Sequence, residues 1–327
     1  PLERHEYLEA AVLAPGMLPV GVAAAGAPEH FTGYVVDGLT WLTESRIGGP
    51  PTRMALDAIG EYEVRTSSFD ASFGLAAGPQ VSVATRSGTN RREGGAYGLF
   101  QPEGERAYVG GFAGAPIAPG RTFAFGSYQG AAVDGSDGDG HLLSARVDHL
   151  LAAARLTGRY ALDTTPGAGH AQNAAAALHV AGAGGLTTEV RLGVSAIGAE
   201  LIAAEYEATA FQAASVTSWT RGRHLVRGGA AWFRRERAVG SLERSGDVLG
   251  LFVQDDWWVR PDVSVSAGLR YDHASPETGG EASDRIAPRL GVTWTADREA
   301  KTLVRAGYGV AYNHQRLDDT VPRLDHW

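Results

Sequence analysis

Two short acidic stretches contain the residue types that most often bind metal ions. HEYLE at His5–Glu9 begins like the helix of a zinc protease, in which a second histidine four residues on completes the ligand pair. Glutamate stands at that position, so we expect no catalytic zinc. DGSDGDG at Asp134–Gly140 gathers three carboxylates around glycines, but its spacing differs from an EF-hand loop and no glutamate closes it. We interpret it as an exposed acidic loop and expect no metal site.

A group of arginines between residues 221 and 237 is the one basic cluster in the sequence. Its members are Arg221, Arg223, Arg227, Arg234, Arg235 and Arg237. RNA-binding arginines usually occupy flexible, low-complexity tracts. These arginines instead surround apolar residues such as Leu225 and Trp232, which favours a strand between two turns. The net charge of −8 also argues against a nucleic-acid partner. We interpret the cluster as solvated strand ends, with anionic lipopolysaccharide as an alternative partner.

No catalytic motif accompanies these groups. The sequence contains no GxSxG elbow, no P-loop and no GxGxxG before a helix. Its 327 residues include no cysteine, which excludes disulfides, thiolate nucleophiles and cysteine-bound clusters. Serine, histidine and aspartate are numerous, but no spacing joins them into a triad. We therefore expect a protein that is not an enzyme and uses no cofactor.

The elements that must position these residues are strands with one apolar and one polar face. Apolar and polar residues alternate in the segments 188–197, 262–272, 285–296 and 302–312, and a period of two residues indicates a half-buried strand. Arg270, Arg289 and Arg305 fall on the polar faces. Glycine contributes 44 residues, about 13% of the chain against roughly 7% on average. This excess suits tight turns and crowded strand positions.

The length of these segments favours strands that cross a membrane. Soluble strands usually have about five or six residues, whereas strands of outer-membrane barrels need about nine to eleven. The alternating segments have about ten to twelve residues, and about thirteen strands can be counted from Gly94 to Tyr312. Aromatic residues near the segment ends are typical of interfacial girdles: Trp219, Trp232, Trp257, Trp258, Tyr271, Trp294 and Tyr312. A large soluble β fold with aromatic residues in its core is the alternative.

The longest uncharged stretch, Ala10 to Pro28, is nearly long enough for a membrane helix. Three prolines and three glycines interrupt it, and both residue types break helices. A signal peptide would begin with basic residues, but three glutamates precede this stretch. We interpret it as a turn-rich loop.

Several segments together resemble a TonB-dependent outer-membrane receptor of the Oar-like branch, the family with a carboxypeptidase-regulatory-like domain. Leu8–Gly16 (LEAAVLAPG) and Tyr34–Thr40 (YVVDGLT) are similar to the plug of that family. The most specific similarity is IGEYEVRTSSFDASFGLAAGPQVSVATRSGTN at Ile59–Asn90. GGAYGLF at Gly94–Phe100 resembles the first barrel strand. Later segments resemble successive barrel hairpins in family order: 110–130, 144–162, 251–272 and 286–312.

This resemblance implies a partial plug over residues 1–92, followed by an antiparallel transmembrane β-barrel over residues 93–327. The plug-motif residues it implies are Asp37, Gly38, Gly74, Gly78, Thr85 and Gly88. It implies a receptor in the outer membrane of a Gram-negative-type bacterium, energised by TonB and surrounded by lipid and lipopolysaccharide. Siderophore, cobalamin, glycan and peptide all stay open as the transported ligand. We expect the lumen-facing candidates Arg270 or Arg289 to pair with plug acids.

The sequence departs from the family pattern at both ends. The accessory domain, the TonB box and the first part of the plug would precede Pro1, and the family barrel has about 22 strands. We therefore expect a fragment or a gene shortened at both ends. Its strands must close on themselves or pair with another chain, because an open edge in lipid leaves backbone groups unsatisfied. Two alternatives stay open: a passive or structural barrel, which would lack the Tyr34–Asn90 module, and a soluble carbohydrate-binding β protein.

Overall fold

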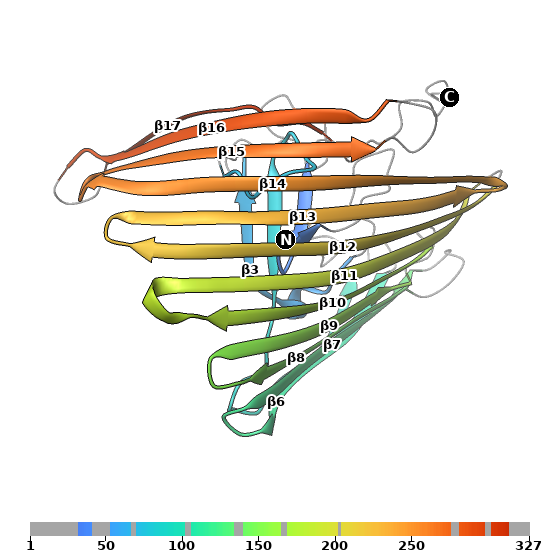
Figure 1. The fold of residues 1–327 in the computed structure, drawn as a ribbon. Coiled ribbons are helices and arrows are strands. Elements are labelled where there is room, and N and C mark those ends of the chain that lie inside the picture. The colour runs from blue at the N-terminus through green and yellow to red at the C-terminus, as the bar shows by residue number, and fades with distance from the viewer. Residues whose placement is uncertain are drawn as a thin grey trace.

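The structure is a computed structural model, and two β-sheets account for most of it (Figure 1). It describes residues 32–40, 53–66, 70–101, 106–133, 140–164, 169–201, 204–275, 281–297 and 302–313. The stretches 5–9 and 10–28, the acidic residues 134–139 and the segment 8–16 lie outside these described residues. Within the described residues, no helix has the length and apolar character needed to cross a membrane.

Thirteen antiparallel strands form the large sheet, and each pairs with the next strand along the chain. The strands are β5 (Glu93–Gln101), β6 (Arg106–Ala118), β7 (Thr122–Val133), β8 (Gly140–Leu150), β9 (Ala154–Asp163), β10 (His170–Ala181), β11 (Leu186–Leu201), β12 (Ala204–Arg221), β13 (His224–Val239), β14 (Leu242–Arg260), β15 (Val263–Ser275), β16 (Ser283–Thr295) and β17 (Leu303–Gly309). The predicted all-β class and the count of thirteen antiparallel strands are confirmed.

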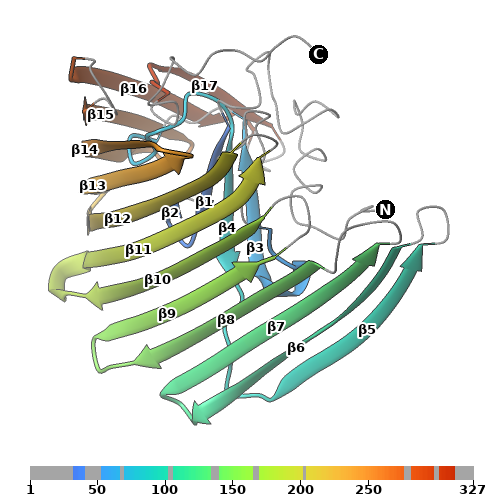
Figure 2. The ribbon, with the colours of Figure 1, turned by 90° about the vertical axis from the view of Figure 1, so that its right-hand side faces the viewer.

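The large sheet is a curved trough, open between β5 and β17 (Figure 2). In the part of the chain that the structure describes, these two strands are the edges of the sheet and do not pair with each other. Of the two expected arrangements, closure of the thirteen strands on themselves is therefore wrong, and pairing with another chain stays a prediction. Barrel diameter grows with strand number, and the curvature of this sheet leaves its two edge strands apart.

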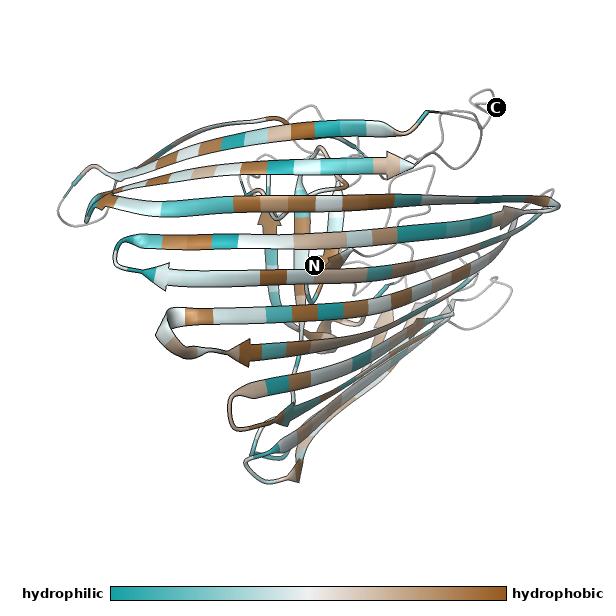
Figure 3. Ribbon diagram, in the orientation of Figure 1, coloured by the Kyte–Doolittle hydropathy of each residue, from teal (hydrophilic) through white to brown (hydrophobic). Residues whose placement is uncertain are grey.

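Exposed apolar side chains line the convex face of the trough, and buried polar side chains line the concave face. Figure 3 shows the corresponding alternation of hydrophilic and hydrophobic residues along the strands. In β14, Leu249, Leu251 and Val253 are 40%, 44% and 52% exposed, whereas Phe252 and Gln254 between and beside them are buried. The alternation predicted in residues 188–197, 262–272 and 285–296 is confirmed in β11, β15 and β16. An exposed apolar face opposite a polar lumen is the pattern of a transmembrane barrel wall.

Polar–aromatic pairs border the apolar band of the convex face. Near one end, Trp232 donates through Nε1 to Asp247 at 3.1 Å. Near the other, His224 stacks on Trp257 at 5.6 Å and contacts Asp255 at 2.7 Å. Asp247 and Asp255 lie on the same strand, so the band between them is about 26 Å long along the strand at roughly 3.3 Å per residue. At the strand tilt of about 40° that is typical of outer-membrane barrels, this length spans roughly 20 Å, somewhat less than their apolar height of about 25 Å.

The small sheet lies on the concave side of the trough (Figures 1 and 2). Its strands are β1 (Gly33–Val36), β2 (Leu39–Thr40), β3 (Ile59–Arg65) and β4 (Gln80–Thr85), in the order β2-β1-β4-β3 with β1 parallel to β4. The turn between β1 and β2 is Asp37–Gly38, whose φ angles of 48° and 77° match the Asp-Gly turn preferred in tight hairpins. An apolar core beneath the sheet includes Tyr34, Val36, Met54, Ala58, Val81 and Val83, and it also includes Ala161 from β9.

Candidate functional site: the interface between the two sheets

The concave face of the large sheet carries a row of buried polar side chains. They include Gln129, Ser144, Asp148, Arg159, Asp163, Asn173, Gln212, Arg235, Gln254, Arg270, Asp272 and Arg289. Burying a polar or charged group costs free energy unless it is hydrogen-bonded or paired. Many of these groups find partners on the small sheet and its loops, so the interface between the two sheets is the candidate functional site.

The Asp37 carboxylate is the centre of the contact with β8 and β9. It accepts hydrogen bonds from the Thr85 backbone N–H at 2.8 Å and from the Thr85 hydroxyl at 2.7 Å. It also pairs with Arg159 at 3.0 Å and Arg146 at 3.5 Å. Arg159 donates in addition to the Val36 carbonyl at 3.2 Å, and Arg146 donates to the Thr85 carbonyl at 2.7 Å. The β1–β2 turn is therefore tied to β4 within the small sheet and to two strands of the large sheet.

Two further contacts join this side of the small sheet to the same strands. The buried Asp163 carboxylate of β9 accepts from the Arg53 backbone N–H at 2.8 Å. The Ser87 hydroxyl donates to Asp148 of β8 at 2.7 Å. Together with the apolar contact of Ala161, these bonds make β8 and β9 a docking surface that combines apolar packing with buried polar pairs.

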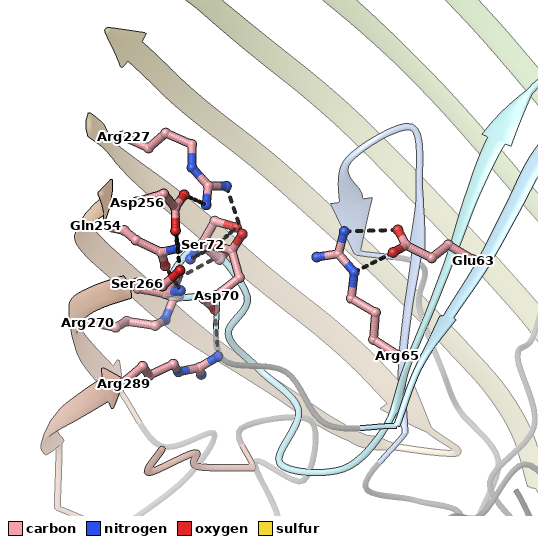
Figure 4. A network of polar contacts seen from close by, with 11 residues as sticks. Glu63, Arg65, Asp70, Ser72, Arg227, Gln254, Asp256, Ser266, Arg270 and Arg289 are labelled. Atoms are coloured by element: carbon pink, nitrogen blue, oxygen red, sulfur yellow. Dashed lines mark hydrogen bonds and ion pairs between the residues drawn. The ribbon is translucent and has the colours of Figure 1, made fainter. Parts of the chain in front are cut away.

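The loop Asp70–Leu75 contacts the opposite side of the trough, and four consecutive strands each supply one side chain to it (Figure 4). Arg227 of β13 pairs with the Asp70 carboxylate at 2.7 Å, and Gln254 of β14 accepts from the Ala71 backbone N–H at 2.7 Å. Arg270 of β15 donates to the carbonyls of Ala71 and Ser72 at 3.4 and 3.3 Å. Arg289 of β16 donates to the carbonyls of Asp70 and Phe73 at 2.6 and 2.8 Å. We name this segment the clasp loop.

A second layer of polar side chains orients the four groups that contact the clasp loop. Asp256 accepts from Arg227 at 2.7 Å and from Gln254 at 3.0 Å. Asp272 pairs with Arg270 at 2.7 Å, and the side chains of both residues are at most 3% exposed. These carboxylates neutralise the arginines and fix their direction, so the donors are pre-oriented toward the loop.

The Asp70 carboxyl is ionised under ordinary conditions. Burial raises its pKa, but the positive charge of Arg227 and hydrogen bonds from Ser72 and Arg227 outweigh that effect, and the pKa lies below its usual value. The ionised form accepts from Ser72 through both the backbone N–H at 2.9 Å and the hydroxyl at 2.7 Å.

The residues expected to carry the site are partly brought together. Asp37 and Thr85 are in direct contact. Gly74 lies against the Arg270 guanidinium and Gly88 against the backbone of Ala124 in β7, and a side chain at either glycine would collide with these groups. Gly38 lies similarly against Arg191, while Gly78 is a half-buried residue two positions before β4.

Two of the three lumen-facing candidates contact the clasp loop. Arg270 and Arg289 are buried and donate hydrogen bonds to backbone carbonyls of this loop, and the Asp70 carboxylate pairs with Arg227. Both arginines thus bind the loop that carries the acid Asp70, and their pairing with plug acids themselves stays a prediction. Carbonyls of a loop outside any sheet have no ladder partner, so they can accept from the arginines. Arg305 of β17 is exposed, on the same face as Arg289 through its pairing with Thr293.

The basic cluster also divides between two environments. Arg221 and Arg223 are exposed beside a turn, as the interpretation as solvated strand ends requires. Arg235 is 5% exposed and Arg227 binds Asp70, so for these two residues that interpretation is wrong. Strand alternation places both on the concave face, which was a signal present in the sequence.

A cavity of about 700 Å³ separates β3 and β4 from β11–β14. Glu63 and Arg65 line it from the small sheet, and Glu189, Arg191 and Gln212 line it from the large sheet. The clasp loop closes one side through Ser72, Phe73, Gly74 and Leu75. In the described part of the chain, no group of three or more metal-binding side chains is present.

Comparisons with known proteins agree with this architecture. The family model described as "TonB dependent receptor-like, beta-barrel" matches residues 76–323. No curated protein matches the chain.

Solved structures match over most of the chain. The siderophore receptor PirA from Pseudomonas aeruginosa is 17% identical, with a TM-score of 0.77 over 94% of this chain and 60% of that one. The ferric-catecholate import receptor Fiu from E. coli K12 is 11% identical, with a TM-score of 0.75 over 95% of this chain and 67% of that one. The ferripyoverdine receptor of the P. aeruginosa outer membrane is 11% identical, with a TM-score of 0.66 over 85% of this chain and 50% of that one. The chain thus spans 60% of the length of the first.

Proposed function

The chain belongs to the TonB-dependent receptor-like β-barrel family, and on that basis we propose that it is an outer-membrane receptor that takes up a solute past a plug. Members of this family are located in the outer membrane of Gram-negative bacteria, which is the location of this protein. We propose that the described residues between 32 and 92 belong to the plug and that the large sheet is the barrel wall. The observation that carries the proposal is the small sheet on the polar concave face, bound at Asp37 and at the clasp loop.

A passive channel is the competing function from the same membrane class. Its conductance requires a lumen filled with water, and porins have a wide aqueous channel. Here buried polar groups from β8, β9 and β12–β16 are satisfied by the small sheet and its loops. This arrangement favours a gated receptor over a passive or structural barrel.

The partners follow from the family and from the convex face. We propose TonB as the source of energy and outer-membrane lipid as the medium around the apolar band, with lipopolysaccharide at its outer edge. PirA is named as a siderophore receptor, so siderophores are the first ligand class to test. We place the chain in the Oar-like branch on the segment 59–90, and we assign it no enzymatic activity because such receptors transport their ligands without covalent change.

Uptake measured in two hosts tests this function. The protein is expressed in the outer membrane of a Gram-negative host without its own siderophore receptors, in versions with and without TonB. Labelled siderophores, cobalamin, glycans and peptides are then supplied one at a time. Uptake that requires TonB supports the proposal. Uptake that is equal in both hosts indicates a passive barrel, and absence of uptake for all four classes refutes a transport role.

A further inference from the structure

We propose that the clasp loop, Asp70–Leu75, is the releasable contact between plug and barrel, and that it opens while the rest of the small sheet stays docked on β8 and β9. The proposal rests on the proposed function, because it names the moving part of that receptor. Release of the loop would open the cavity that lies between the small sheet and β11–β14.

The two sides of the small sheet are held by different kinds of contact. On the docked side, Ala161 of β9 is part of the small sheet's own apolar core, beside Tyr34, Val36 and Val83. Separation there would expose this core to water as well as break the Asp37 pairs. The linker from β4 to β5 runs along the same side, where Gly88 packs against the backbone of Ala124. Both features favour a fixed attachment.

The clasp side is held by polar contacts to a single loop. Four side chains from β13–β16 bond to it, and most of their partners are backbone groups of residues 70–73. Water can replace each of these bonds once the loop leaves the wall, so the net free energy of each is small compared with its strength in a dry interior. Among residues 70–75 Ala71 alone is buried. Such a contact is strong when assembled, and its separation exposes less apolar surface than separation of the docked side.

Backbone strain at the end of the clasp loop also favours release. Leu75 has a φ angle of 69°, in the left-handed region that residues other than glycine and asparagine rarely adopt. A conformation of this kind persists only where surrounding contacts impose it. Arg270 and Arg289 hold the preceding residues Ser72 and Phe73 by their carbonyls. Release of the loop would relieve this strain.

The walls of the cavity are already paired along their own strands. Glu63 and Arg65 of β3 form a two-bond pair at 2.7 and 2.9 Å, which Figure 4 shows apart from Arg227, Arg270 and Arg289 of the wall. The Arg65 guanidinium also lies over the Phe73 ring of the clasp loop, 4.9 Å from its centroid. Glu189 and Arg191 of β11 form the equivalent pair at 2.8 and 2.6 Å. Each pair lies within one strand, so both pairs remain intact when the clasp loop leaves the wall, and Arg65 loses only its contact with the Phe73 ring. Release of the loop therefore leaves these charges paired.

Hydrogen–deuterium exchange of the intact protein in lipid nanodiscs tests the order of release. The reporters are peptides that contain residues 70–79 for the clasp loop and residues 32–40 for the docked side. We expect the clasp peptide to exchange at least tenfold faster. Arg270→Gln removes two loop contacts and should accelerate the clasp peptide about fivefold or more, whereas Leu75→Gly relieves the strain of the closed state and should slow it severalfold. Neither variant should change the 32–40 peptide.

A disulfide between the clasp loop and β15 tests the same opening in a second way, in case Arg270→Gln or Leu75→Gly does not fold. An ideal Cβ at Gly268 of β15 lies 2.8 Å from the Ala71 Cβ, so Ala71→Cys with Gly268→Cys places two thiols within disulfide reach after a small shift. The chain has no other cysteine. The oxidised pair should suppress exchange of the clasp peptide, and reduction of the same sample should restore it.

Equal exchange of the two peptides in the unmodified protein, or an oxidised pair that leaves the clasp peptide unchanged, would overturn the proposal. Exchange does not depend on a transported ligand. Independent opening of the loop without any TonB-dependent uptake would therefore contradict the proposed function and leave this inference standing. Uptake that is identical in the oxidised and reduced pair would contradict the inference and leave the function standing.

Discussion

Replacement of Asp37 by asparagine is the sharpest test of the docked side of the small sheet. Asparagine keeps the size of the side chain and can still accept from the Thr85 N–H, which donates at 2.8 Å in the native protein. It removes the negative charge that lies 3.0 Å from Arg159 and 3.5 Å from Arg146. The side chain of Arg159 is 3% exposed, so its charge would be left buried beside a neutral group.

The magnitude follows from this burial. Removing one partner of a buried ion pair costs about 3–5 kcal/mol, because the remaining charge is uncompensated. The matched control is Glu63→Gln, since Glu63 is 54% exposed and its partner Arg65 is 35% exposed. An exposed pair of this kind contributes about 0–1 kcal/mol. Both variants lose one carboxylate charge, so the difference between their losses of stability measures the effect of burial.

The assay is native-state hydrogen exchange of peptides from β1 and β4, whose backbone hydrogen-bond ladder ends beside Asp37. A loss of about 3 kcal/mol accelerates exchange by roughly two powers of ten, since about 1.4 kcal/mol corresponds to a factor of ten. Glu63→Gln should change it by less than about fivefold. An effect of Asp37→Asn below tenfold, or equal to that of Glu63→Gln, would refute the assignment of Asp37 as the centre of the docked side.

Three further predictions concern other parts of the interface and the membrane face. The pKa of Asp70 is held below its usual value of 3.8, so the stabilisation of the clasp contact by this carboxylate is fully present above that value and is lost as pH falls through the lower folded pKa. Protection of the clasp peptide from exchange should therefore decrease below about pH 4. Asp70→Asn should remove this pH dependence. Gly88→Val should lower the free energy of unfolding by about 1–3 kcal/mol or more, because the backbone of Ala124 occupies the space of the new side chain. Urea unfolding measures this change. Gly158→Val is the control, since the space at Gly158 is open. Leu251→Arg should lower the stability in lipid by about 2–4 kcal/mol because this side chain faces outward in the middle of the apolar band; refolding into vesicles measures it, and an unchanged unfolding midpoint would contradict a lipid-facing position.

The strands and their faces were within reach of sequence reasoning. The alternation in 262–272 and 285–296 assigned Arg270 and Arg289 to the polar side, and both are buried on the concave face. The same parity was available for Arg227 and Arg235, but their position in a dense basic cluster suggested solvated ends. Alternation was the better guide, because a strand fixes the side of each residue whatever its neighbours are.

The partners of these residues were beyond sequence reasoning. Arg227 meets a residue 157 positions away and Arg289 one that is 219 positions away. Pairing with plug acids was expected for Arg270 or Arg289, whereas the groups of the clasp loop that accept from Arg270 are the backbone carbonyls of Ala71 and Ser72. No local pattern shows where a loop between β3 and β4 will cross the trough.

The sequence by itself determined the all-β class, the thirteen strands and the face of each residue, because a period of two is set within each strand. Only the tertiary structure decided that the sheet stays open as a trough, that β8 and β9 dock the small sheet, and that β13–β16 converge on Asp70–Leu75. These features depend on the curvature of the whole sheet and on where a distant loop meets it. Both arise from contacts between residues that are far apart in the chain.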